Sequence, residues 1–235
     1  MKLQFVALLI LGPLAWSPVC ADSPKGPSGF PTPEGLVACA SGDKVAGAIA
    51  RVAAELGGEF LGCFQSERAV EVSSTAKTAL VPVEYAFAIA LKGEGHTPAD
   101  LDKMLSTVKE QWKDFDPLSK EFKEAYTARL NEMIKSSGLT PSPSLKSLKP
   151  VLISIDRPEV NYYSVTSIRT YSFQLSGDEI KLTKINSDAV VLRRSQLIRL
   201  TIQRTLSDPA DVAQVQDEIA KWARETAQDS LPARP

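Results

Sequence analysis

Apolar and polar residues alternate over residues 83–91, which predicts a β-strand with two chemically different faces. The large side chains point one way, namely Val83, Tyr85, Phe87, Ile89 and Leu91. Three of the four positions between them are alanines, at 86, 88 and 90. Large residues on one face and small ones on the other indicate that both faces are covered. The alanine face would let a helix approach closely.

The residues that follow this strand predict a helix. Thr97 can cap a helix, Pro98 suits its first position, and Asp100 completes a capping box. An apolar stripe follows at Leu101, Met104, Leu105, Val108, Trp112 and Phe115. A second helix is expected from Pro117, so that residues 97–138 form a helical insertion. Residues 139–150, rich in Pro and Ser, are expected to be a linker.

The second half of the chain predicts strands that are separated by short turns, between residues 151 and 205, and then a final helix. Pro209 opens that helix, and its apolar stripe runs through Val212, Val215, Ile219 and Trp222. The order of elements favours an α+β fold, an antiparallel β-sheet covered by helices and resembling an α/β/α sandwich.

Two stretches of the chain share a strand, a loop and a capped helix. Residues 98–100 and 209–211 both read Pro-Ala-Asp, and each triplet follows an alternating strand. This pattern suggests two related strand-then-helix halves, which an old duplication would explain. The alternative is that Pro-Ala-Asp is a common way to begin a helix.

The first 21 residues are typical of a secretory signal peptide. Lys2 precedes an apolar run of about a dozen residues, short of the roughly 20 that a spanning helix needs. Val19 and Ala21 provide the small residues expected before a cleavage site. Lipidation of Cys20 is the alternative. Residues 22–35 are expected to be a flexible lead-in, and residues 36–228 a single domain in a periplasmic or secreted protein with no transmembrane segment in the mature chain.

Cleavage after Ala21 leaves two cysteines, Cys39 and Cys63. In an oxidising compartment this pair predicts a disulfide, whereas two buried free thiols are the alternative. These cysteines and a single histidine do not supply a tetrahedral metal site, and no metal or cofactor is expected.

The charge and the motifs weigh against several functions. The chain has 27 basic and 28 acidic residues in 235, so that nucleic acid is not an expected partner. No Gly-x-Ser-x-Gly elbow, phosphate loop or dinucleotide fingerprint is present.

The sequence resembles a group of uncharacterised bacterial secreted proteins. The stretches that carry the resemblance are EFLGCF, YAFAIALKGEGHTPADLDKML and QLIRLTIQRTLSDPADVAQVQDEIAKW. They are patterns of strand and helix, so the resemblance implies no mechanism. The strands with their C-terminal helix also look like the Mog1/PsbP-type sandwich, at the level of topology alone.

Two groups of residues are candidates for function. His96, in a glycine-containing loop before a helix, is a weak candidate for acid–base chemistry. Tyr162, Tyr163 and Tyr171 with Arg169 would form an exposed recognition strip, unless they pack in an edge strand. We expect an exported, non-catalytic protein that binds a partner protein or an apolar small molecule in the cell envelope. The alternatives are a hydrolase that uses residues near His96, and a structural subunit of an envelope complex.

Overall fold

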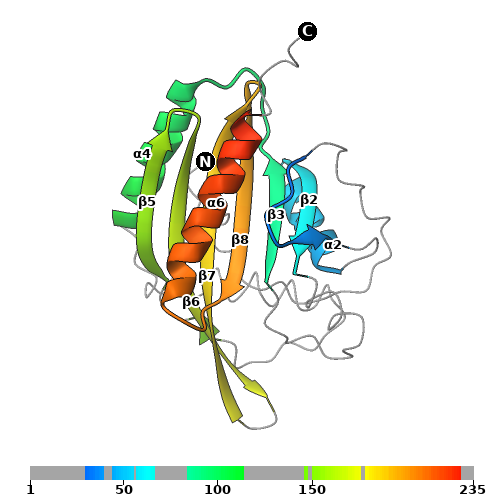
Figure 1. Ribbon diagram of the computed structural model, residues 1–235, viewed down its shortest axis with the longest axis vertical. Coiled ribbons are helices and arrows are strands. Elements are labelled where there is room, and N and C mark those ends of the chain that lie inside the picture. The colour runs from blue at the N-terminus through cyan, green and yellow to red at the C-terminus, as the bar shows by residue number, and fades with distance from the viewer. Residues whose placement is uncertain are drawn as a thin grey trace.

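Eight antiparallel strands form one sheet in the computed structural model, which describes residues 30–39, 44–55, 57–66, 84–113, 146–147, 150–175 and 178–228 (Figure 1). The strands are β1 (Val37–Ala38), β2 (Glu59–Gln65), β3 (Tyr85–Ala90), β4 (Lys146–Ser147), β5 (Val151–Glu159), β6 (Tyr162–Leu175), β7 (Asp178–Arg193) and β8 (Gln196–Thr205). Their order across the sheet is β1-β2-β3-β8-β7-β6-β4, and β5 also pairs with β6.

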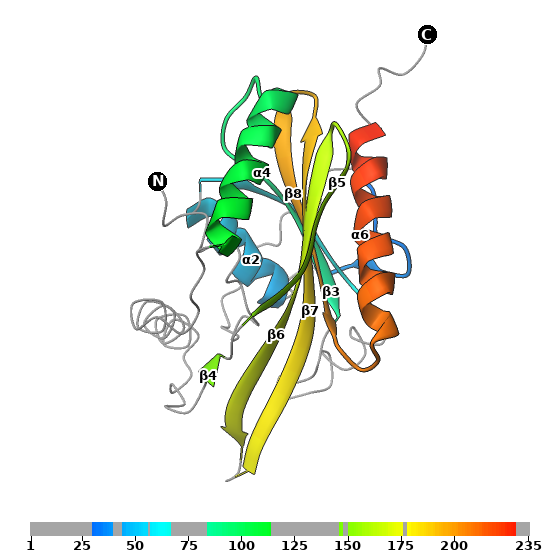
Figure 2. The ribbon, with the colours of Figure 1, turned by 90° about the vertical axis from the view of Figure 1, so that its left-hand side faces the viewer.

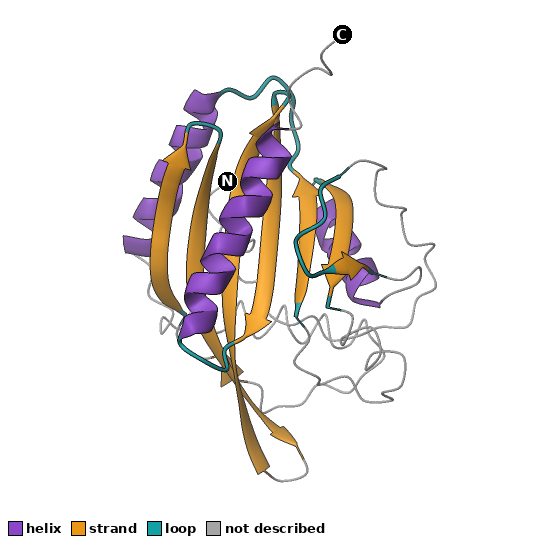
Figure 3. Ribbon diagram, viewed as in Figure 1, coloured by secondary structure: helices purple, strands orange, loops and turns teal. Residues whose placement is uncertain are grey.

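Within the described residues, three helices cover the sheet: α2 (Lys44–Glu55), α4 (Pro98–Lys113) and α6 (Ala210–Gln228). Figure 2 shows the sheet edge-on, with α6 on one side and with α4 and α2 on the other. Figure 3 shows the same helices in purple against the orange strands. The α+β class expected from the sequence is therefore confirmed.

The alanines of β3 lie on the same side of the sheet as α6. Ala86, Ala88 and Ala90 are buried in the cluster that lies against α6, together with Trp222. Phe64 meets the Trp222 ring edge-on, with the ring centroids 5.7 Å apart. The small face predicted for residues 83–91 is thus buried, on the side of the sheet that carries α6.

Part of the segment expected to be a lead-in contacts the core. The Phe30 ring meets the Trp222 ring edge-on at 6.2 Å. The indole Nε1 of Trp222 donates to the Pro31 carbonyl oxygen at 2.8 Å. Residues 1–29, which include the expected signal peptide, lie outside the described residues.

Helix α4 begins as its capping box predicts. The Thr97 backbone N–H donates to Oδ2 of Asp100 at 2.9 Å, and the Thr97 hydroxyl donates to the same oxygen at 2.8 Å. Leu101, Leu105 and Val108 are buried in a second cluster, on the face away from α6. Residues 114–138 of the expected helical insertion, and most of the expected linker, lie outside the described residues.

The two Pro-Ala-Asp helices are not equivalent in space. Strands β3 and β8 are neighbours in the sheet, yet α4 and α6, which follow them, lie on opposite faces. Ile89 faces away from α6, whereas Leu200, which stands at the same distance before its own Pro-Ala-Asp, lies in the α6 cluster. The duplication stays a prediction, and this arrangement weighs against it.

A tight turn joins two central strands of the sheet, β7 and β8. Arg194 (φ 49°) and Ser195 (φ 63°) connect β7 to β8, and both adopt the left-handed conformation. Two residues of this kind between antiparallel strands form the type I′ turn, which usually contains Asn and Gly. The turn brings Ser195 to the loop before α4, where its carbonyl oxygen accepts a hydrogen bond from the His96 backbone N–H at 2.9 Å.

Candidate functional site

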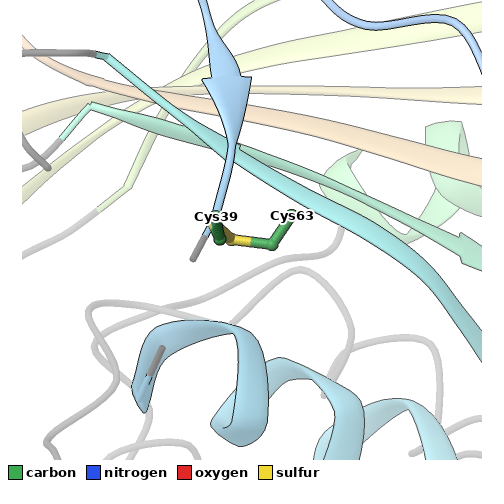
Figure 4. Close-up of a disulfide and its surroundings, with 2 residues drawn as sticks. All are labelled: Cys39 and Cys63. Atoms are coloured by element: carbon green, nitrogen blue, oxygen red, sulfur yellow. A yellow bond between two sulfur atoms is a disulfide. The ribbon is translucent and has the colours of Figure 1, made fainter. Parts of the chain in front are cut away.

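The predicted disulfide is present. Cys39 and Cys63 are bonded, with their Cα atoms 5.4 Å apart (Figure 4). The Cys39 N–H also donates to the Cys63 carbonyl oxygen at 2.8 Å. The bond therefore ties the residue after β1 to β2 and fixes one end of the sheet.

His96 lies where the loop before α4 meets the β7–β8 turn. Its side-chain Nε2 is buried, with no hydrogen-bond partner among the described residues. A Cβ added at Gly93 would come within 2.8 Å of this nitrogen, so Gly93, at φ 113°, leaves room for the ring. A His96→Ala variant that fully restores the phenotype of a knockout strain would rule out the hydrolase alternative.

The three described side chains of the tyrosine–arginine group do not form one exposed strip. Tyr162 is 0% exposed and lies in the α6 cluster, whereas Tyr163 is 2% exposed and lies in the α4 cluster. Burial raises the pKa of Tyr163. Arg169 lies on the Tyr163 side of β6 and is 7% exposed. The side chain of Tyr171 lies outside the described residues.

A buried polar network runs along the same face, centred on Asp188 of β7. Arg199 donates to Oδ1 of Asp188 from Nε at 2.9 Å and from Nη2 at 2.6 Å. The Thr201 hydroxyl donates to that oxygen at 2.6 Å, and the Asn186 amide donates to Oδ2 at 2.7 Å. The carboxylate thus receives four hydrogen bonds, three at Oδ1 and one at Oδ2, and one countercharge.

The network continues in a fixed direction through two amides. The Tyr85 hydroxyl donates to Oε1 of Gln203 at 2.6 Å, and Nε2 of Gln203 donates to Oδ1 of Asn186 at 2.7 Å. Asn186 then donates to Asp188. Each amide oxygen in this chain accepts a hydrogen bond from the residue before it.

The buried charges on this face do not balance. The buried charged side chains of the described residues are Arg169, Lys184, Arg199 and Asp188, all between 4% and 7% exposed. Three cations and one anion give a formal charge of +2. Burial lowers the pKa of Lys184 to about 8. The cluster of Arg169, Lys184, Arg199 and Asp188 was not predicted from the sequence, although Arg169 was named there as part of an exposed recognition strip.

A different feature lies at the edge of the sheet, on β5. Val151, Leu152 and Ile153 are 51%, 36% and 41% exposed, and they are consecutive. Strand β5 pairs with β6 on one side, and no described strand pairs with its other side. Three consecutive exposed apolar residues therefore lie on a strand edge whose backbone N–H and C=O groups do not pair with any described strand.

The comparisons with known proteins add no family to this geometry. No protein-family model matches the chain, and no curated protein matches it either. No described helix has the length and apolar character that crossing a membrane requires.

Proposed function

We propose that this chain is an exported, non-catalytic protein of the cell envelope, and that it binds a partner protein through the free edge of β5. The exposed apolar run Val151–Ile153 is the observation that supports this proposal. Exposed apolar residues on an unpaired edge strand favour β-augmentation, in which an extended segment of another chain adds to the sheet. The disulfide between Cys39 and Cys63 supports export, since such bonds persist in oxidising compartments.

The occupant that fits this edge is a segment of a different protein. A symmetric antiparallel pair of two complete β5 strands would be centred on Ile155. Leu152 would then lie opposite Pro158, which has no N–H to donate, and Val151 would lie opposite Glu159. A foreign segment that pairs with residues 151–156 alone avoids both conflicts. Its apolar side chains would cover those of β5.

Site-specific photo-crosslinking in the exporting cell tests this proposal. A photoreactive amino acid at position 152 should yield one adduct with a second protein, identified by mass spectrometry. The same amino acid at position 214 is the matched control, because Gln214 is exposed on the side of α6 that faces β8, where it bonds to Glu218, a partner of Arg204. A second substitution, Ile153→Lys, should abolish the adduct formed at position 152, because a lysine on an edge strand opposes strand addition.

Three outcomes would overturn the proposal. The same adduct from positions 152 and 214 would show that the second protein contacts the surface non-specifically. An adduct of twice the chain's mass would make the occupant a second copy. No adduct from position 152 would leave the edge unoccupied. If the partner instead co-purifies in fixed stoichiometry, the binding function holds and the protein is a structural subunit.

A further inference from the structure

Strand β5 is irregular at two points, which limits what its backbone can offer a partner. Its pairing with β6 shifts register between Leu152 and Ser154, and again between Asp156 and Glu159. Each shift leaves an extra residue on β5 and disrupts the ladder locally. Only a short regular stretch remains between the two shifts. If the free edge binds a partner segment, as proposed for this protein, backbone hydrogen bonds would be few, and side chains must select that segment.

Two carboxylates of β5 lie on one face of the sheet. Asp156 is opposite Ser164 of β6, and Glu159 is opposite Tyr162. Directly opposed residues in an antiparallel pair share a face, and so do residues two positions apart in one strand. Since Tyr162 is buried in the α6 cluster, both carboxylates are on the α6 side of β5. Asp156 and Glu159 are both exposed.

Neither carboxylate has a countercharge within the described residues, whereas the arginine between them does. Arg157 forms an ion pair with Asp102 of α4. No described ion pair includes Asp156 or Glu159, and the exposed Arg224 of α6 forms none with either of them. Along its length β5 therefore presents the exposed apolar run of residues 151–153 and then two acidic groups that are not neutralised.

The neighbouring helices hold β5 from both sides. Figure 2 shows β5 between α4 and α6. Nε2 of Gln216 on α6 donates to the Ser154 hydroxyl oxygen at 2.8 Å, and Arg157 pairs with Asp102 on the α4 side. A surface that is ordered before binding loses less conformational entropy when a partner arrives. The apolar and acidic parts of the edge are thus presented in a fixed order.

We propose that the partner segment is basic at its N-terminal end and apolar at its C-terminal end, and that it pairs with β5 in the antiparallel direction. This inference rests on the proposed function of the β5 edge. Antiparallel pairs are slightly more stable per residue than parallel ones. In that direction the residues that meet Glu159 and Asp156 precede those that meet residues 151–153. Lysine or arginine would neutralise the two carboxylates, and the same carboxylates would repel an acidic segment.

Charge reversal combined with the photo-crosslink at position 152 tests the chemistry of the segment. The variant Asp156→Lys/Glu159→Lys should lower the yield of the adduct by at least about fivefold, because two exposed ion pairs, each worth up to about that factor, become repulsive contacts. Tandem mass spectrometry of the wild-type adduct should find lysine or arginine within a few residues on the N-terminal side of the crosslinked residue of the partner.

The variant Glu59→Lys/Glu94→Lys is the matched control, because it makes the same change in net charge at two exposed carboxylates. Glu59 begins β2 and Glu94 lies in the loop after β3, and β8, β7 and β6 separate these strands from β5. The control should give the wild-type yield of adduct. Circular dichroism confirms that both variants are folded.

The outcomes separate this inference from the proposed function. An adduct whose yield is unchanged in Asp156→Lys/Glu159→Lys, or a crosslinked segment without basic residues, would overturn the inference and leave binding at β5 intact. Basic residues on the C-terminal side of the crosslink would overturn the antiparallel direction. The absence of any adduct in the wild type would overturn the proposed function, and this inference with it.

Discussion

Replacing Asp188 by Ala should destabilise the fold far more than an ordinary substitution of a surface acid. The change removes four hydrogen bonds and the countercharge of Arg199. Arg199 is 5% exposed, and its Nη1 already lacks a hydrogen-bond partner among the described residues, so water cannot readily replace what it loses. Breaking a buried ion pair by removing one partner costs about 3–5 kcal/mol. We expect Asp188→Ala to lower the free energy of unfolding by that amount.

The companion changes separate the ion pair from the rest of the network. Arg199→Met alone leaves the carboxylate buried, with Thr201 and Asn186 as its remaining donors, and should also be costly. The double variant Asp188→Ala/Arg199→Met removes both charges, so it should lose less than the sum of the single variants by at least about 2 kcal/mol. Asp217→Ala, at an exposed position of α6, is the surface control and should change stability by less than about 0.5 kcal/mol.

Urea unfolding, followed by circular dichroism with the disulfide intact, measures these free energies. The core position of Trp222 provides a fluorescence probe of the same transition. If the double variant loses as much as the two single variants together, Asp188 and Arg199 do not act as a pair. The reasoning from burial would also be refuted if Asp188→Ala were no worse than Asp217→Ala.

Three further predictions concern other parts of the fold. The stability of the wild type relative to Lys184→Met should rise between pH about 8 and 10.5, because the folded pKa of Lys184 is lowered to about 8. Over that range Lys184 is protonated in the unfolded chain but not in the folded one, so raising the pH favours the folded state. Urea midpoints of the wild type and of Lys184→Met, measured across the range, check this. A stability difference between the two proteins that does not change with pH would contradict the prediction. Replacing both Cys39 and Cys63 by Ala should lower the free energy of unfolding by about 3 kcal/mol. A reductant should lower the urea midpoint of the wild type but not that of the double variant, and an unaffected wild type would refute the role of the disulfide. Ser195→Gly should raise the melting temperature in calorimetry, since Ser195 has a φ of 63° that costs an L-residue about 1–2 kcal/mol, partly offset by the greater freedom of unfolded glycine. A lower melting temperature would show that the turn is not strained.

Local patterns predicted the elements that have a periodic apolar face. The alternation over residues 83–91 gave both faces of β3, and the Thr97–Asp100 capping box marked the start of α4. The parity of the cysteines predicted the bond between Cys39 and Cys63. The strand and helix signals depend only on residues that are close together in the sequence. The disulfide signal depends on the number of cysteines, because two cysteines allow a single pairing.

The polar network was missed because alternation alone does not say whether a polar face meets solvent. Arg199, Thr201 and Gln203 alternate with apolar residues in β8, a pattern that usually denotes one wet face. Strand β8 lies between β3 and β7 in the interior of the sheet, and helices cover both sides of that sheet. The sheet order buries these polar residues, and the sequence does not state that order.

The two buried cations Arg199 and Lys184 should respond in opposite ways when a charge is removed. Asp188→Ala leaves Arg199 without its countercharge and should destabilise the fold. Lys184→Met, by contrast, removes a buried ammonium that forms no ion pair with the described residues, so it should stabilise the fold at neutral pH. Urea unfolding measures both changes. If Lys184→Met is less stable than the wild type, the contact of the ammonium with the Tyr85 ring outweighs the cost of burying the charge.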